Sequence, residues 1–140
     1  SLPTPRVGQV LRDSYRWANE RRHDDQAGSK DRPVAVVVCT RTKADETVVG
    51  VCPITHHPQV DDATIEIPSR DRKRLGLDDE RHWLVASEIN RFIWPRPDLR
   101  RRPDDGTFRY GMLPAHLYEQ LRTKLLELIK TRWLRHVTRD

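Results

Sequence analysis

The sequence predicts a mainly β or α+β fold, a small barrel followed by a C-terminal amphipathic helix. Two observations lead to this prediction: short β-branched segments recur between turn residues, and the last long segment has its apolar residues at helical spacing. Strands do not alternate with helices and no internal repeat is present, which disfavours a parallel sheet. The chain of 140 residues fits one compact domain, residues 1–140.

The first half of the chain is expected to form four strands. They lie at residues 7–11, 34–39, 46–52 and 63–67. The second and third are short β-branched runs, and a turn at 43–45 joins them into a hairpin at the heart of the sheet. Pro53 is expected to end the third strand, because proline cannot donate to a central ladder. Tyr15 and Trp17 either extend the first strand or pack beneath later segments of the chain, and residues 18–31 form a long polar loop.

The second half is expected to add a short helix, three strands and a long helix. The strands lie at residues 83–85, 89–94 and 106–110, and the last of these is expected to be the final strand. Residues 69–75 form one or two helical turns before Gly76. An amphipathic helix begins at Pro114 and ends near Lys130, with its apolar side chains on one face. These side chains are Leu117, Leu121, Leu125, Leu128 and Ile129. Residues 133–137 either extend this helix or pack separately.

The chain is basic, with 26 Lys and Arg against 21 Asp and Glu and a formal charge of +5. Two arginine-rich clusters, at residues 70–74 and 96–102, suit phosphate because a guanidinium pairs with two oxygens at once. The alternative is that both clusters form solvated faces, since Asp71 and Asp98 lie among them. Charge alone therefore favours nucleic-acid binding only slightly over the alternative.

The sequence also indicates a soluble, cytoplasmic protein without membrane contact. No apolar run approaches the ~20 residues of a membrane-spanning helix, and the N-terminus lacks a basic segment followed by an apolar stretch. Cys39 and Cys52 lie in predicted strands without CxxC spacing, and we expect reduced core residues. The tryptophans are expected to pack in the core more often than to stack on a base.

Motifs for cofactors and metals are missing from the sequence. It contains no Walker loop, GxGxxG, GxSxG, HExxH or zinc-ligand spacing. We therefore expect no cofactor and no metal site. Two polar segments remain as candidates for chemistry, residues 30–33 before the predicted hairpin and residues 53–58 after it.

Arg32 and Thr55 should face each other, because the start of one hairpin strand lies beside the end of the other. His56 and His57 follow Thr55, so one sheet edge gathers a cation, a hydroxyl and two imidazoles. The alternative is structural: Arg32 pairs with Asp31 or a helix end, Thr55 caps a turn, and the histidines are surface loop residues.

Five segments, in this order, resemble the MazF/PemK (Kid-like) toxin family. They are Gly8-Gln9-Val10, Arg32-Pro33 before a valine-rich strand, Pro53-Ile54-Thr55, residues 88–93, and Gly111-Met112-Leu113-Pro114. The resemblance covers residues 6 to about 130. It implies an SH3-like barrel, homodimerisation, a cognate antitoxin partner, and metal-independent cleavage of single-stranded RNA at short sequences.

By matched position, the resemblance implies that Arg32 and Thr55 are catalytic. Glu88 matches another acid of the family's site, and Asp25 resembles the acidic residue of its Glu-Gln-x-Gly loop. The chain departs from the family pattern at His56, where Ser or Thr is expected, and in the longer loop before Arg32. Further candidate substrate-binding residues are Lys30, His57 and Arg91.

The chemistry of these residues is consistent with RNA cleavage. Attack by the RNA 2′-hydroxyl needs a base, an acid at the leaving oxygen, and positive charge on the phosphorane. Arg32 suits the last role, and Thr55 can donate to a phosphate oxygen. His56 or His57 could move a proton near neutral pH, with Glu88 as the alternative base. Two other functions stay open, a catalytically silent nucleic-acid- or protein-binding barrel and a toxin acting on a protein such as gyrase.

Overall fold

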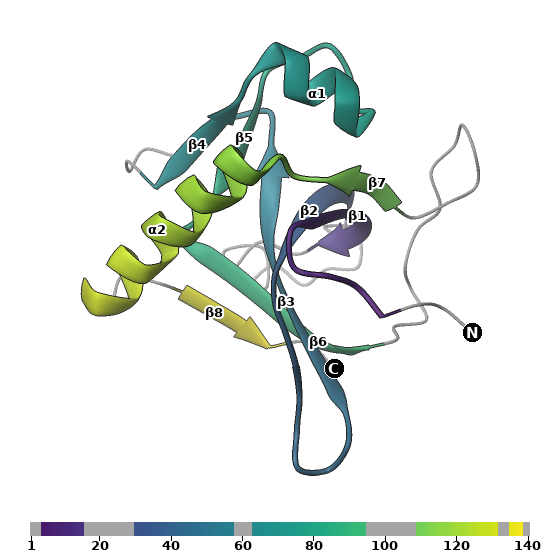
Figure 1. Cartoon of the computed structure of the whole chain (residues 1–140), viewed down its shortest axis with the longest axis vertical. Helices are drawn as coiled ribbons and strands as arrows, with labels where there is room; N and C mark the ends of the chain where they lie inside the picture. The colour runs from purple at the N-terminus through teal and green to yellow at the C-terminus, as the bar shows by residue number, and fades with distance from the viewer. Residues whose placement is uncertain (1–3, 16–29, 58–62, 95–108, 132–134, 139–140) are drawn as a thin grey trace.

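The computed structural model describes residues 4–15, 30–57, 63–94, 109–131 and 135–138 (Figure 1). The elements follow in the order β1 (Gln9–Tyr15), β2 (Lys30–Arg41), β3 (Thr47–Thr55), β4 (Thr64–Ile67), α1 (Ser69–Leu75), β5 (His82–Val85), β6 (Glu88–Trp94), β7 (Arg109–Met112), α2 (Ala115–Thr131) and β8 (Arg135–Thr138). The predicted β-rich class with a long C-terminal helix is confirmed. Most of the predicted loop at 18–31, Trp17, Trp133 and the basic cluster at 96–102 lie outside the described residues.

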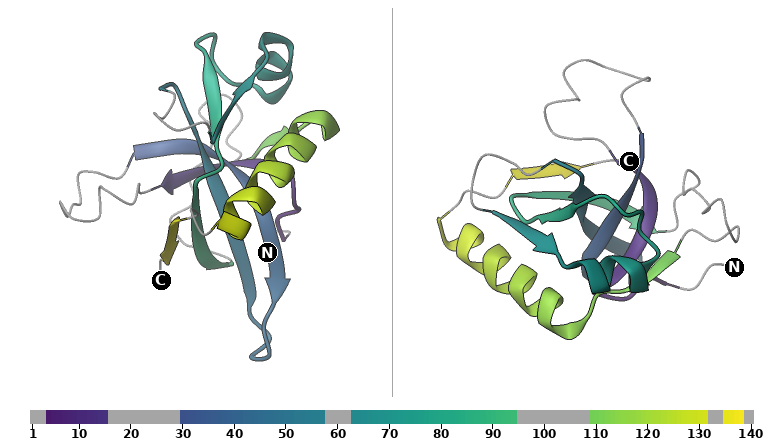
Figure 2. Two further views of the ribbon diagram at one scale, coloured as in Figure 1. Left: turned by 90° about the vertical axis from the view of Figure 1, so that its left-hand side faces the viewer. Right: turned by 90° about the horizontal axis from the view of Figure 1, so that it is seen from above.

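The strands form a largely antiparallel sheet in the order β4-β5-β3-β2-β1-β7, with β6 paired to β3 and β8 parallel to β6. β3 pairs with β2 along one side. Along the other side it pairs first with β6, through residues 47–51, and then with β5, through residues 54–55. Because β3 exchanges one neighbour for another, the sheet splits and curls into a half-barrel (Figure 2).

Pro53 does not end β3, so the sequence prediction was wrong at this point. β3 continues to Thr55, and Pro53 stands opposite Val34 of β2. Pro53 lies between the residues that pair with β6 and those that pair with β5. Such an interruption of the ladder is a place where a missing N–H is tolerated. The extension matters for function, because it makes Thr55 the last residue of a strand instead of a loop residue.

Alternating side chains of the central hairpin fill a core on each face of the sheet. Val34 and Val36 belong to one buried cluster, whereas Ala35 between them belongs to the other. The first cluster consists of Leu11, Val34, Val36, Val49, Val51, Phe92 and Trp94. Burial on both faces explains why the central parts of these strands are apolar at successive positions instead of alternating with polar residues.

Helix α2 covers the second cluster with its apolar face. Leu117, Leu121 and Leu125 are buried there, each worth roughly 1.5–3 kcal/mol of apolar burial. Ile129, which the sequence places on the same face, is 54% exposed. Each step of four residues turns a side chain by about 40°, so Ile129 points about 120° away from Leu117. In the part of the chain that the structure describes, no helix is long and apolar enough to cross a membrane.

The first and last strands differ from the prediction. β1 begins at Gln9 and not at Val7, because Gly8 adopts a φ of 92° in a turn where the Gln9 N–H donates to the Arg6 carbonyl. The strand predicted at 106–110 overlaps β7 at Arg109 and Tyr110, and residues 106–108 lie outside the described residues. It is not the final strand, because β8 follows α2 and pairs with β6. The C-terminal segment therefore packs separately and does not extend the helix.

Candidate active site

The register of the central hairpin brings Arg32 and Thr55 to the end opposite its turn. The β2–β3 ladder ends with Val34 opposite Pro53, so Arg32 and Thr55 each lie two residues beyond its last pair. Arg32 also pairs with Asp13 of β1, and Thr55 pairs with Trp83 of β5. Arg32 is thus held by β1 and Thr55 by β5, and their shared place beyond the end of the β2–β3 ladder is the basis of the active-site hypothesis.

The Thr55 side chain is 6% exposed and takes part in the turn that follows β3. Its Oγ1 accepts a hydrogen bond of 3.1 Å from the His57 backbone N–H. A hydroxyl that accepts in this way still has its own proton to donate. The structural role that the sequence left as an alternative is therefore present, and it is compatible with donation to a phosphate oxygen.

Arg32 lies at the mouth of the hairpin and is half-buried. Its Nε atom is buried, so the guanidinium is not fully surrounded by water. A charge in such a position acts on a neighbouring anion through a lower effective dielectric than a fully solvated arginine would.

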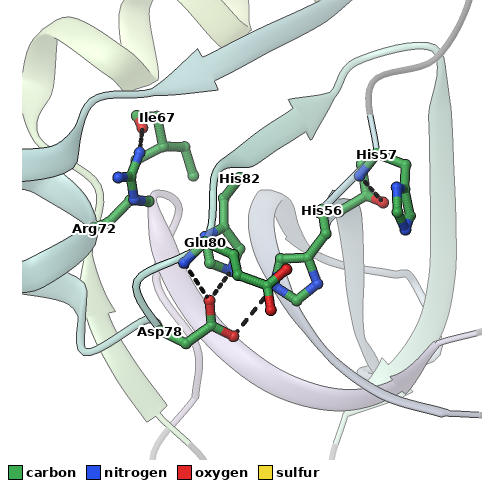
Figure 3. Close-up of polar contacts among 8 residues, drawn as sticks. His56, His57, Ile67, Arg72, Asp78, Glu80 and His82 are labelled. Carbon is green, nitrogen blue, oxygen red and sulfur yellow. Dashed lines mark hydrogen bonds and ion pairs between the residues drawn. The ribbon is translucent and has the colours of Figure 1, made fainter.

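His56 lies in a cluster that the sequence analysis did not anticipate. Its Nε2 is 3.2 Å from Oδ2 of Asp78, and Nε2 of His82 is 3.6 Å from Oδ1 of the same carboxylate (Figure 3). The two imidazole rings are 4.4 Å apart between centroids. Asp78 and His82 are four residues apart and 22 or more residues from His56. No spacing motif links them, because the fold of β3 against β5 creates the cluster.

Burial and neighbouring charges set the protonation of this cluster. Desolvation and the adjacent His56 lower the pKa of the His82 imidazole, and the opposing effects of Asp78 and the Glu80 backbone are smaller. Partial burial of Asp78 disfavours its charge, but the Glu80 N–H and the two imidazoles outweigh that effect and lower the carboxyl pKa. The cluster therefore combines an ionised carboxylate with a buried imidazole that is neutral at pH 7.

Glu88 is the first residue of β6 and is 1% exposed. Its charge acts on the Cys52 thiol, whose pKa is raised first by burial and then by Glu88. Cys52 is buried and Cys39 is half-buried, and both are free thiols, as predicted. Glu88 therefore belongs to the interior near Cys52, on the strand that pairs with residues 47–51 of β3.

The predicted substrate-binding residues occupy different surroundings. The His57 ring is exposed and lies apart from the cluster of His56, Asp78 and His82 (Figure 3). Arg91 is exposed and pairs with Gly50, so it lies about 17 Å along β3 from Thr55. Lys30 is the first residue of β2. Asp25 lies outside the described residues.

The basic residues of α1 are mostly exposed to solvent. Arg72 donates a hydrogen bond of 3.1 Å to the Ile67 carbonyl, while Arg70, Lys73 and Arg74 are exposed. Cations in the last turn of a helix are favoured by its dipole. This cluster fits the solvated-face alternative.

Solved structures match the chain over most of its length. MazF (Form-I) from Deinococcus radiodurans has a TM-score of 0.56 and 16% sequence identity, and the match covers 91% of this chain and 98% of that chain. The MazE-MazF structure (Form-III) from the same organism gives the same TM-score and coverage at 17% identity. No protein-family model and no curated protein sequence matches. The antiparallel half-barrel and its C-terminal helix therefore have the MazF-like fold.

Proposed function

We propose that this protein is the endoribonuclease toxin of a toxin-antitoxin pair and cleaves single-stranded RNA without a metal in the chemical step. One observation carries the proposal: in a MazF-like fold, Arg32 and Thr55 each lie two residues beyond the Val34–Pro53 pair that ends the β2–β3 ladder. A cation beside a hydroxyl donor suits a phosphate group that gains negative charge during the reaction.

The reaction begins with attack of the RNA 2′-hydroxyl on the adjacent phosphorus. The bond to the 5′-oxygen of the next nucleotide breaks, which leaves a 2′,3′-cyclic phosphate and a 5′-hydroxyl. Arg32 pairs with two phosphorane oxygens, and the Thr55 hydroxyl donates a hydrogen bond to one of them. The products therefore carry a distinctive end chemistry that identifies the 2′-hydroxyl as the nucleophile.

A proton must leave the 2′-hydroxyl and another must reach the leaving oxygen. His56 is the better placed carrier, because it follows Thr55 directly and is exposed to a substrate. Glu88 is the alternative base, but its burial keeps it from a substrate unless the surrounding groups move. His57, Lys30, Asp25 and Arg91 are proposed to contact the RNA on either side of the cleaved bond.

The proposed partners are a second copy of the chain and an antitoxin. The similar MazE-MazF structure contains MazE, which supports a corresponding partner here. Val7 and Met112 are large apolar side chains that are 39% and 47% exposed. Their residues lie at the end of the sheet where β1 meets β7, and covering them in a dimer would remove apolar surface from water. The proposed site of action is the cytoplasm, where RNA is available.

The direct test is a cleavage assay with a long single-stranded RNA in EDTA. We expect cleavage at a short recurring sequence. A matched RNA with a single 2′-deoxy nucleotide at the cut site should resist cleavage, because its nucleophile is missing. Activity that required magnesium, or equal cleavage of the deoxy substrate, would contradict the mechanism.

A further inference from the structure

Three side chains at the end of β3 and the start of β5 form a compact set of potential metal ligands. His56, Asp78 and His82 each offer one ligand atom, and these atoms all lie within 4.8 Å of one another. Both imidazoles direct Nε2 toward the same carboxylate, one to each of its oxygens (Figure 3). Two nitrogen ligands and one carboxylate oxygen are the donor set of many three-ligand zinc sites.

The His82 ring has unmet bonding capacity in the absence of a cation. It is 3% exposed, and its Nδ1 makes no hydrogen bond with the described residues. Its Nε2 is 3.6 Å from Asp78, which is beyond hydrogen-bond distance. A cation between the His82 Nε2 and the Asp78 carboxylate would contact both groups.

The distances fit a small transition-metal ion. Zinc binds nitrogen and oxygen at about 2.0–2.1 Å, so the ligand atoms of a tetrahedral site lie about 3.3 Å apart. The separations of 3.2 Å and 3.6 Å, which involve the two different oxygens of Asp78, are close to this value, and no two ligand atoms of the set lie more than 4.8 Å apart. Imidazole ligands also disfavour Mg²⁺ and Ca²⁺, which prefer oxygen.

We propose that His56, Asp78 and His82 bind one Zn²⁺ ion per chain. The His56 and Asp78 side chains are 40% and 57% exposed, which gives the ion a path from solvent and leaves a fourth position for water. The ion joins the segment after β3 to the segment before β5, so it stabilises the end of the sheet that carries Thr55. This site shares His56 with the proposed ribonuclease, and because a metal-bound Nε2 carries no proton, the proposed RNA cleavage belongs to the metal-free protein.

The test is titration of EDTA-treated, dialysed protein with Zn²⁺ by calorimetry, and with Co²⁺ by visible absorption. We expect one ion per chain and Co²⁺ bands typical of a four-coordinate nitrogen–oxygen site. Zn²⁺ at a hundredfold excess over its dissociation constant should raise the melting temperature by about 5–10 °C.

Because the His56 and Asp78 side chains are exposed, variants at these two positions should still fold. His56→Asn and Asp78→Asn should each weaken Zn²⁺ binding by about 100-fold or more, because removal of even an outer-shell partner typically costs 10- to 100-fold. The amide introduced by Asp78→Asn keeps an oxygen that can accept the 2.9 Å hydrogen bond from the Glu80 N–H. The matched controls are His57→Asn and Asp79→Asn, exposed neighbours outside the cluster that should bind Zn²⁺ like the wild type.

The outcomes separate this site from unspecific binding and from the ribonuclease proposal. The zinc-site proposal would be overturned if the ligand variants and their controls lost Zn²⁺ affinity equally, or if none of them lost any. It would also be overturned by wild-type protein that binds Zn²⁺ no more tightly than His56→Asn. Because every readout is binding or stability without RNA, failure of the zinc site and failure of the ribonuclease proposal are distinguishable.

Discussion

Replacement of Thr55 by valine separates the chemical role of its hydroxyl from its structural role. Valine has nearly the same shape, so the change removes an oxygen and keeps the packing of a side chain that is 6% exposed. The structural cost is the hydrogen bond of 3.1 Å from the His57 N–H. Loss of one such bond destabilises a protein by about 1 kcal/mol, and we expect the melting temperature to fall by about 3–5 °C.

The effect of Thr55→Val on catalysis should be far larger than its effect on folding. Removal of one donor to a developing oxyanion typically costs on the order of 100- to 1,000-fold in rate. A stability loss of about 1 kcal/mol from a typical total of roughly 5–15 kcal/mol leaves nearly all molecules folded. Unfolding therefore cannot account for a hundredfold loss of activity.

The assay compares single-turnover cleavage of one RNA by the wild type, Thr55→Val and Thr55→Ser, with melting temperatures measured in parallel. Thr55→Ser keeps the hydroxyl and should retain most of the rate. Thr47→Val, at the other end of β3, is the matched control and should cleave normally. Normal cleavage by Thr55→Val, or an equal loss in Thr47→Val, would refute the assignment of Thr55 to the site.

Other predictions concern the core, the thiol and the assembly. Leu121→Ala should destabilise the protein by about 2–5 kcal/mol, because Leu121 is fully buried under α2, whereas Ile129→Ala on the exposed side of the helix should change the unfolding free energy by less than about 0.5 kcal/mol in denaturant titrations. Cys52 should resist iodoacetamide in the native state and react after unfolding, since burial raises its thiol pKa; rapid native labelling, followed by mass spectrometry, would be inconsistent with that burial. Because the thiol pKa is higher in the folded state than in the unfolded state, only the unfolded state loses this proton as the pH rises above the ordinary thiol pKa. The stability advantage of the wild type over Cys52→Ala should therefore shrink above about pH 9. Sedimentation should give a dimer at micromolar concentration, and a Met112→Glu variant should shift it toward the monomer; a wild type that sediments only as a monomer would argue against the dimer.

The secondary structure could be predicted from the sequence largely because its signals are local. The β-branched runs and the turn at 43–45 define the central hairpin, and the leucine spacing defines α2. The errors occurred where pairing between distant segments decides the structure. Pro53 reads as the end of a strand, yet β3 continues because it changes partners there, and β8 is stabilised by pairing with β6.

The candidate site shows the same division between local and distant information. Arg32 and Thr55 flank one predicted hairpin, so their place just beyond the open end of its ladder follows from the hairpin itself. Asp78 and His82 could not be connected with His56, because only the pairing of β3 with β5 brings those segments together. The burial of Glu88 was also hidden, since an acidic residue at the start of a strand gives no sign that its carboxylate points into the interior.

The most direct test of the proposed active site is RNA cleavage by Arg32→Ala and Arg32→Lys in EDTA, with the product ends mapped. The wild type should leave a 2′,3′-cyclic phosphate and a 5′-hydroxyl. Arg32→Ala should lose on the order of 100- to 1,000-fold in rate, about 3–4 kcal/mol of transition-state stabilisation, and Arg32→Lys should recover little because an ammonium lacks the two-pronged geometry. The fall in rate should be much larger than any accompanying fall in melting temperature can explain. Normal cleavage by Arg32→Ala, or a loss that merely follows unfolding, would contradict the account.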